Sequence, residues 1–264
     1  MGRYHAILFD MDGTLLDTLT DMQDAVNHVL AAHGLPLRTL EEVRRFVGNG
    51  AGPLIHRALP EGYPQEQKVL AEYRAYYQAH NCVQTCPYPG IPELLERLEV
   101  GLLVLPDVEE EDPLRREITA LAEEKGIETL FLAEDADVTF GESALRIYAP
   151  LGSGGANEEG LSVLCTAGDF DGLITGDMND TVEKRLIKYG SLPDLELLVA
   201  GHHGSKYATS EELLLATTPE LAVISVGYNT YGHPAPDTLD RLEQAGCTVW
   251  RTDLQGTITV RATD

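Results

Sequence analysis

Basic residues are scarce in this sequence of 264 residues: 19 Lys and Arg stand against 43 Asp and Glu, which gives a formal net charge of −24. The shortage argues against unaided binding of nucleic acid, because contacts to phosphates need clustered Lys and Arg. A bound divalent metal would reverse that argument locally. The charge is also uneven, since residues 1–98 carry −4 and residues 99–264 carry −20. This asymmetry indicates two segments of different origin or role.

Long apolar runs are absent, and cysteines are few. No stretch approaches the roughly 18 apolar residues of a membrane span, and the first residues lack the apolar core and cleavage site of a signal peptide. We therefore expect a cytoplasmic protein without a membrane span. The cysteines are Cys82, Cys86, Cys165 and Cys247, and their spacing matches no common zinc site. We predict reduced, non-catalytic thiols, with a Cys82–Cys86 disulfide as the alternative.

The apolar pattern changes along the chain. The run from His5 to Phe9 predicts a buried strand that ends at Asp10. Apolar residues at helical spacing then predict an all-helical unit between Asp17 and His80. From Val100 onward, predicted strands alternate with predicted helices, which indicates an α/β fold. A hairpin around Leu254-Gln255-Gly256 is expected to close the fold.

The string Asp10-Met11-Asp12-Gly13-Thr14 is the first candidate site. Two carboxylates two residues apart, just after a strand, can point into one cleft. One can attack phosphorus as a nucleophile, and the other can protonate the leaving group and then activate water. Both can hold Mg²⁺ weakly through oxygen ligands. The alternative is a turn with solvated acids, which is the better interpretation of two such carboxylates alone.

The longer string from Ile7 to Thr18 resembles the haloacid dehalogenase superfamily, specifically its phosphoglycolate phosphatase-like members. The helices that follow resemble the helical cap of that group, including Phe46-Val47-Gly48-Asn49-Gly50, and Tyr88-Pro89-Gly90 resembles the return from cap to core. The resemblance covers about Met1 to Leu98. It implies that Asp10 is the nucleophile, Asp12 the acid/base and Thr14 a contact to the phosphate of a small phosphorylated substrate.

The resemblance to the phosphatases is incomplete beyond the cap. The family pattern has a Ser or Thr at the end of the next core strand, where this chain has Leu105-Pro106. A later Lys that balances the phosphate charge has no counterpart in a matching context. We therefore expect the first site to be incomplete.

A second candidate site comprises Asp177, His202, His203 and His233. Each follows a predicted strand, and carboxylate and imidazole groups at neighbouring strand ends form the ligand set of Zn or Mn hydrolases. The alternative for any one of the histidines is a loop residue with satisfied hydrogen bonds. The occurrence of three histidines at strand ends near Gly176-Asp177 favours an ancestral metal site.

The region from about Ile91 to the end resembles the C-terminal metallo-β-lactamase-like domain of ComEC, the competence channel of DNA uptake. The matching pieces are Leu173–Asp177, Val199–Ser205, Ile224–Pro234 and Trp250-Arg251-Thr252-Asp253. The resemblance implies that Asp177 bridges the metals, and it leaves open which histidine completes the set. The His-x-His-x-Asp-His string of that fold is missing, so this site is also expected to be incomplete.

These resemblances predict a chimera that joins the two families near Gly90–Leu98, with one domain at 1–98 and another at 99–264. The predicted fold class is α/β: a first strand with a helical cap, followed by the C-terminal half of an αββα sandwich. The function implied is a hydrolase-derived fusion, nominally a Mg-dependent phosphatase with both sites incomplete. The alternatives are a metal-dependent phosphodiesterase or nuclease acting on nucleic acid, and a non-catalytic fusion. Open sheet edges predict self-association.

Overall fold

The structure is a computed structural model that describes residues 7, 9, 13–48, 50–108, 113–152, 159–227, 229 and 232–262. The chain divides into two compact units, and each is described by itself. Unit 1 comprises Met1–Leu103 and Glu110–Thr129, and unit 2 comprises Val104–Glu109 and Leu130–Asp264. The predicted strand His5–Phe9 lies outside the described residues, apart from Ile7 and Phe9, and the boundary after Leu98 stays a prediction.

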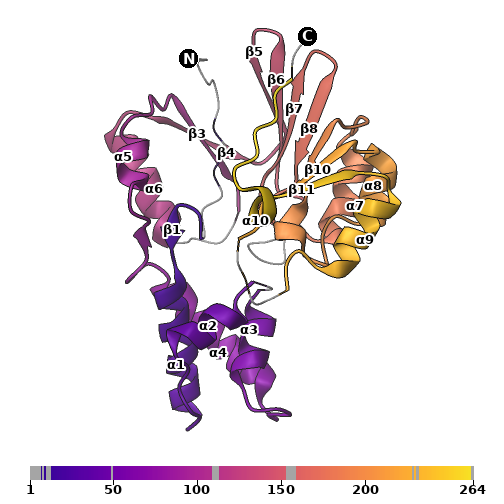
Figure 1. Cartoon of the computed structure of the whole chain (residues 1–264). Coiled ribbons are helices and arrows are strands. Elements are labelled where there is room, and N and C mark those ends of the chain that lie inside the picture. Colours follow the sequence, from indigo (N-terminus) through magenta and orange to yellow (C-terminus); the bar gives the residue numbers. More distant parts are fainter. Residues whose placement is uncertain are drawn as a thin grey trace. The chain divides into compact units, whose positions relative to one another are not determined.

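Helices and strands alternate along most of the described chain (Figure 1). The helices are α1 (Leu19–Ala32), α2 (Leu40–Phe46), α3 (Ala51–Ala58), α4 (Glu66–His80), α5 (Ile91–Leu95), α6 (Pro113–Glu124), α7 (Asp180–Tyr189), the 3₁₀ helix η1 (Gly201–Gly204), α8 (Glu211–Thr217), α9 (Pro236–Gln244) and α10 (Thr252–Gln255). The strands are β1 (Leu16–Asp17), β2 (Cys86–Pro87), β3 (Leu102–Pro106), β4 (Glu128–Leu132), β5 (Ala136–Phe140), β6 (Ser143–Tyr148), β7 (Ser162–Ala167), β8 (Phe170–Ile174), β9 (Leu197–Val199), β10 (Leu221–Ile224) and β11 (Thr248–Arg251). None of the helices in the described ranges has the length and apolar character that crossing a membrane requires.

Four helices, α1 to α4, form a bundle in unit 1, as the apolar spacing predicted. Val26, Val29 and Leu30 of α1 lie on one helical face and are at most 1% exposed, which places them in the core of the bundle. Helix α2 begins with a capping box: the Thr39 hydroxyl accepts a hydrogen bond from the Glu42 N–H, and the Glu42 carboxylate accepts one from the Thr39 N–H. The bundle therefore has its own apolar core and its own helix start signals.

The chain enters and leaves this bundle through two short antiparallel strands. Strand β1 pairs with β2, with Leu16 opposite Pro87 and Asp17 opposite Cys86. Asp21, in the first turn of α1, is 3% exposed, and its carboxylate accepts hydrogen bonds from the backbone N–H groups of Gln84 and Thr85. The two connections are thus tied together close to Thr14, the described member of the first candidate site.

Unit 2 is built on a sheet of seven strands in the order β11-β10-β9-β8-β7-β6-β5. Strands β5 to β8 are antiparallel to their neighbours, whereas β8 to β11 are parallel. Helices α7, α8 and α9 connect the parallel strands, and Figure 1 shows them together on one face of the sheet. Leu173, Leu198 and Ile224 are fully buried in the core that the sheet shares with these helices. The predicted α/β class is confirmed, while strand β5 was not predicted.

The predicted hairpin at the end of the chain is wrong. Strand β11 pairs in parallel with β10, and the chain then continues as α10. The Thr252 hydroxyl accepts a hydrogen bond from the Val226 N–H over 2.7 Å, which ties the start of α10 to the segment after β10. Residues 256–262, all of them described, form no strand. The chain after Arg251 therefore turns into a helix because of a contact to a residue far away in the sequence.

Separate apolar cores in the two units predict independent unfolding transitions. Leu198→Ala removes a fully buried side chain of unit 2 and should lower its free energy of unfolding by about 2–5 kcal/mol. The one tryptophan, Trp250 in β11, reports this transition by fluorescence during urea unfolding. Far-UV circular dichroism reports the helices of both units, so unfolding of the bundle should add a transition that fluorescence lacks. Leu215→Ala, at a side chain 72% exposed, is the matched control. A single transition in which both signals shift together would contradict the prediction.

Candidate functional site

The polar residues of the second candidate site lie at one edge of the unit 2 sheet. Strands β8, β9 and β10 are parallel neighbours, so their carboxyl ends meet at the same edge, the usual position of ligand sites in open α/β sheets. Asp177 follows β8, His202 and His203 follow β9, and His233 follows β10. The structure therefore brings together the four residues that the sequence singled out here.

The spacing of these side chains defines a compact cluster. The Nε2 atom of His202 lies 3.8 Å from Oδ2 of Asp177, an ion-pair distance when the imidazole is protonated. The ring centroids of His202 and His233 are 5.8 Å apart, and those of His202 and His203 are 6.3 Å apart, both in edge-to-face orientation. His233 is only 8% exposed, whereas the Asp177 side chain is 42% exposed. His202 is thus the centre of a cluster that opens to solvent on the side of Asp177.

The two adjacent histidines adopt an unusual backbone conformation. His202 has φ 48° and ψ 49°, and His203 has φ 54° and ψ 28°, so both lie in the left-handed region, which costs a non-glycine residue roughly 1–2 kcal/mol. Gly204 continues the turn at φ 80°. Such strain persists where the surrounding structure holds it, and it is concentrated at functional sites. The backbone conformation marks this turn as a candidate site independently of the side chains.

The glycines on either side of the histidines let the turn approach its neighbours closely. A Cβ atom on Gly201 would lie 2.9 Å from Oγ1 of Thr175, at the end of β8. A Cβ atom on Gly204 would lie 2.6 Å from Cβ of Pro234, next to His233. The histidines were predicted as site residues and these glycines were not, although the Gly-His-His-Gly string is typical of a tight turn.

A backbone carbonyl orients the imidazole of His203, and the Asn229 side chain binds the backbone of His233. The Nδ1 atom of His203 lies 2.8 Å from the Ser225 carbonyl oxygen, which can only accept, so Nδ1 carries the hydrogen. The Asn229 side chain accepts from the His233 N–H over 3.0 Å and donates to the His233 carbonyl over 2.7 Å. Asn229 was missed as a site residue, because its role depends on an Asx-type turn with residues that follow it.

Among the described residues, this cluster does not form a complete metal site. Within the described part of the chain, no group of three or more His, Cys, Asp or Glu residues is arranged to hold a metal ion. The residues present therefore do not fit a tightly bound Zn or Mn centre, which needs three or four converging ligands. The arrangement supplies imidazole and carboxylate groups that can bind and exchange protons.

The catalytic residues of the first candidate site, Asp10 and Asp12, lie outside the described residues. Their roles and their binding of Mg²⁺ stay predictions. Thr14 lies in a turn that Gly13 begins at φ 74°, with a hydrogen bond of 2.9 Å from the Gly13 N–H to the Leu16 carbonyl. Strand β3 ends at Leu105-Pro106, so no hydroxyl stands at that strand end.

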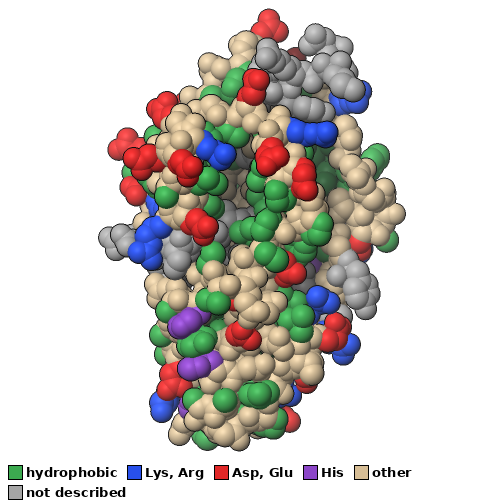
Figure 2. Space-filling view, turned by 90° about the vertical axis from the view of Figure 1, so that its left-hand side faces the viewer, with side chains coloured by type: hydrophobic (Ala, Val, Ile, Leu, Met, Phe, Trp, Pro, Cys, Tyr) green, Lys and Arg blue, Asp and Glu red, His purple; other side chains and the backbone are tan. Residues whose placement is uncertain are grey.

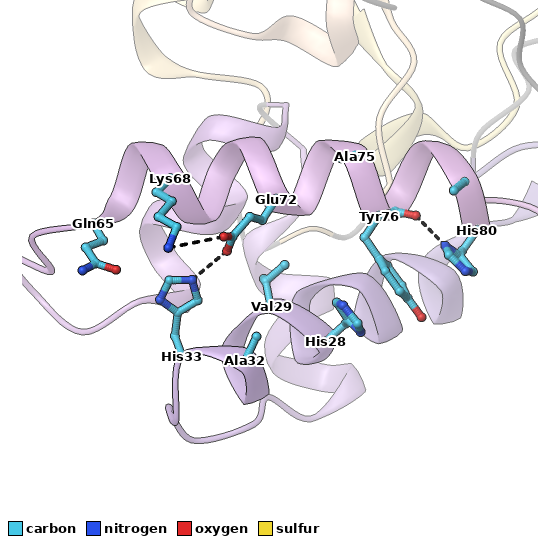
Figure 3. Close-up of a pocket in the computed structure, with 11 residues that line it drawn as sticks. His28, Val29, Ala32, His33, Gln65, Lys68, Glu72, Ala75, Tyr76 and His80 are labelled. Atoms are coloured by element: carbon cyan, nitrogen blue, oxygen red, sulfur yellow. Dashed lines mark hydrogen bonds and ion pairs between the residues drawn. The ribbon is translucent and has the colours of Figure 1, made fainter.

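A groove of about 750 Å³ lies between α1 and α4 in unit 1 (Figure 3). This groove was not predicted from the sequence. The rings of His28 and His80 stack on opposite sides of Tyr76, with centroids 3.8 and 4.0 Å from it. Glu72 is 2.7 Å from Nε2 of His33, and this hydrogen bond holds the pKa of Glu72 below its ordinary value. Figure 2 shows histidines exposed on the bundle surface beside hydrophobic side chains. These contacts join the two helices.

The sequence profile of haloacid dehalogenase-like hydrolases matches residues 7–105 of this chain. The N-acetylmuramic acid 6-phosphate phosphatase of Pseudomonas aeruginosa is 41% identical over 104 residues, which cover 39% of this chain and 46% of that protein. The N-terminal segment is thus similar to HAD-like hydrolases, with phosphatases among its relatives. The chain spans less than half the length of the curated relatives that it matches.

A different group of proteins is similar to this chain as well. Competence protein ComA of Neisseria gonorrhoeae is 42% identical over 88 residues, which cover 33% of this chain and 13% of that protein. ComE operon protein 3 of Bacillus subtilis is 28% identical over 171 residues, which cover 64% of this chain and 22% of that protein. Because 171 residues exceed the length of the segment 7–105, this second similarity extends beyond the HAD-like segment.

The close approach of Gly204 predicts a steric penalty that a matched glycine lacks. Gly204 and Gly246 both have φ 80°, and a Cβ on Gly246 would have nothing within 4 Å. Gly246→Ala should lower the free energy of unfolding of unit 2 by about 1–2 kcal/mol. Gly204→Ala should lower it by about 1–3 kcal/mol more, because the added methyl group overpacks against Pro234. Urea unfolding followed by Trp250 fluorescence measures the free energy of unfolding of both variants. An equal decrease in the two variants would show that the turn accommodates the added methyl group without a steric penalty.

Proposed function

We propose that this chain is a hydrolase-derived fusion whose N-terminal segment is of the HAD phosphatase type. The observation that carries the proposal is the match of residues 7–105 to HAD-like hydrolases, combined with a continuation into a separate α/β unit with its own core. The proposed substrate is a small phosphomonoester. We assign the similarity to competence proteins to the second unit.

In this proposal, Asp10 attacks phosphorus and Asp12 donates a proton to the leaving oxygen. Asp12 then removes a proton from the water that hydrolyses the phosphoaspartate, which regenerates Asp10 and releases inorganic phosphate. Thr14 contacts the phosphate. Asp10 and Asp12 would hold Mg²⁺, which would neutralise phosphate charge. The chain lacks the hydroxyl at the end of β3 and a matching Lys, so the charge that develops in the transition state is poorly stabilised.

Hydrolysis of p-nitrophenyl phosphate in the presence of Mg²⁺ should therefore be slow or absent. Because preorganised charge neutralisation contributes a factor of about 10²–10³ per group, turnover well below that of a complete phosphatase is expected. Asp10→Asn should abolish any Mg-dependent turnover, while Asp169→Asn, at an exposed turn between β7 and β8, should not change it. Rapid turnover that is lost in Asp10→Asn alone would contradict the incompleteness of this site.

A second candidate function is a metal-dependent phosphodiesterase or nuclease in unit 2, with nucleic acid as substrate. The clustering of Asp177, His202, His203 and His233 at the carboxyl ends of parallel strands favours it. The similarity to a protein named as competence protein ComA adds support. The incomplete ligand set opposes tight metal binding, so a third possibility is a non-catalytic fusion that associates with itself through open sheet edges.

Metal analysis separates the second candidate from the non-catalytic fusion. After dialysis, the purified chain should hold well under one equivalent of Zn or Mn, because the described residues contain no complete metal-binding group. Asp177→Asn and His202→Ala should reduce what is bound, and His56→Ala, at an exposed position of the helical bundle, should not. Two tightly held ions per chain, with metal-dependent cleavage of nucleic acid, would instead establish a functional hydrolase site in unit 2.

A further inference from the structure

A loop follows the left-handed turn directly. It comprises residues 205–210, of which Ser205, Ala208 and Thr209 are at most 1% exposed, while Lys206 and Tyr207 are exposed. The backbone N–H and C=O groups of the three buried residues are therefore shielded from water and need partners within the protein. Their partners come from two helices, α7 and α9, that pack on either side of the loop.

One partner is the carboxylate of Glu183, on α7, which is fully buried. Its Oε1 accepts a hydrogen bond from the Thr209 N–H over 2.5 Å, and its Oε2 accepts one from the Ser210 N–H over 2.8 Å. Burial raises the pKa of Glu183, and the hydrogen bonds from Thr209 and Ser210 oppose that rise. Burying a carboxylate costs free energy unless its oxygens accept hydrogen bonds. Both oxygens of Glu183 accept them from this one loop, so the carboxylate and the loop hold each other in place.

The other partner is Arg241 of α9, whose guanidinium donates to the carbonyls of Ala208 and Thr209 over 2.9 and 3.0 Å. The carboxylate of Glu183 thus binds N–H groups of the loop, and the guanidinium of Arg241 binds C=O groups of the loop. Charged partners make hydrogen bonds roughly twice as strong as neutral ones. These contacts fix the backbone of Thr209, which is itself left-handed at φ 54°.

Thr209 connects the loop to the turn that carries the histidines. Its Oγ1 accepts a hydrogen bond from the Gly201 N–H over 3.1 Å, at the start of the turn. The Ser205 N–H donates to the His202 carbonyl over 2.9 Å, at the other side of the turn. Helix α7 begins just after Asp177, and the N–H of its first residue, Asp180, donates to the Tyr207 carbonyl over 2.8 Å.

We infer that Glu183 is a positioning residue for the cluster in unit 2. Through Thr209, it holds His202 and His203 in the left-handed conformation, at a fixed distance from Asp177. The chemistry that the cluster performs rests on the second proposed function, but the positioning does not. A buried acid that only stabilised the fold would affect the whole of unit 2 equally, so the two roles give different results.

The test measures the accessibility of individual side chains in the full chain. Carbethoxylation of His202 at neutral pH, located by mass spectrometry from fragment ions that separate it from the adjacent His203, reports opening of the turn. Alkylation of Cys247, a thiol 9% exposed in the same unit and remote from the turn in sequence, reports opening of unit 2 as a whole. His28 and His80, exposed on the helical bundle, are references within the same molecule. The readout requires neither metal nor turnover, so its failure is distinguishable from failure of the proposed function.

Glu183→Gln replaces one carboxylate oxygen with an NH₂ group that faces a backbone N–H, so one hydrogen bond is lost. We expect His202 modification to accelerate about five- to tenfold with Cys247 alkylation changing much less. Glu212→Gln, which removes the same charge from an exposed position on α8, should leave both rates unchanged. Parallel acceleration of His202 and Cys247, or no change at His202, would overturn the inference.

A second variant decides the matter if Glu183→Gln does not fold. Thr209→Val removes the hydroxyl that accepts from Gly201 and leaves both backbone N–H groups that Glu183 binds. It should accelerate His202 modification selectively, by about threefold or more. An unchanged rate at His202 would show that Thr209 does not link the loop to the turn, and the inference would then be wrong.

Discussion

The close approach of the turn Gly201–Gly204 to the ends of neighbouring strands is the constraint on which the polar edge of unit 2 depends. Glycine at both ends lets the backbone pass Thr175 and Pro234 at distances that a Cβ atom would not permit. Between the glycines, His202 and His203 adopt left-handed conformations that neither residue prefers. Backbone N–H groups of this turn and of the loop that follows donate hydrogen bonds to the buried Thr209 hydroxyl and the buried Glu183 carboxylate, and His202 lies beside Asp177.

Buried apolar residues in the described part of this chain form three clusters, one in unit 1 and two in unit 2. The helical bundle closes around its own core, with fully buried side chains such as Val26 and Ile55. The seven-stranded sheet and its three helices close around another, with Leu173 and Leu198 at its centre. Because hydrophobic stabilisation depends on the area removed from water within each core, neither unit needs the apolar contacts of the other.

Function depends more strictly than folding on a complete set of residues. Catalytic groups act as a unit, so the loss of one partner removes most of the rate that the others provide. The similarity to HAD-like hydrolases ends at residue 105, where β3 closes with Leu105-Pro106 and no hydroxyl. In unit 2, Asp177 and the histidines keep their places at the strand ends without a complete ligand set among the described residues.

The sequence by itself determined the features that depend on near neighbours. Apolar spacing predicted the helical bundle, and alternation of strands and helices predicted the α/β unit. The positions of Asp177, His202 and His233 after strands followed from the same pattern, since parallel strands bring their carboxyl ends together. Their common edge was therefore within reach of sequence reasoning.

Only the tertiary structure decided what depends on residues far apart in the chain. The end of the chain forms α10 and no hairpin, because Thr252 binds the backbone of Val226. Glu183 reads as an ordinary surface acid of an amphipathic helix, and it is buried because its two donors lie at Thr209 and Ser210. The close approach of Gly201 to Thr175 and of Gly204 to Pro234 likewise joins residues that are distant in the sequence. Local propensity cannot encode such contacts, since their free energy arises only when the distant partner is already in place.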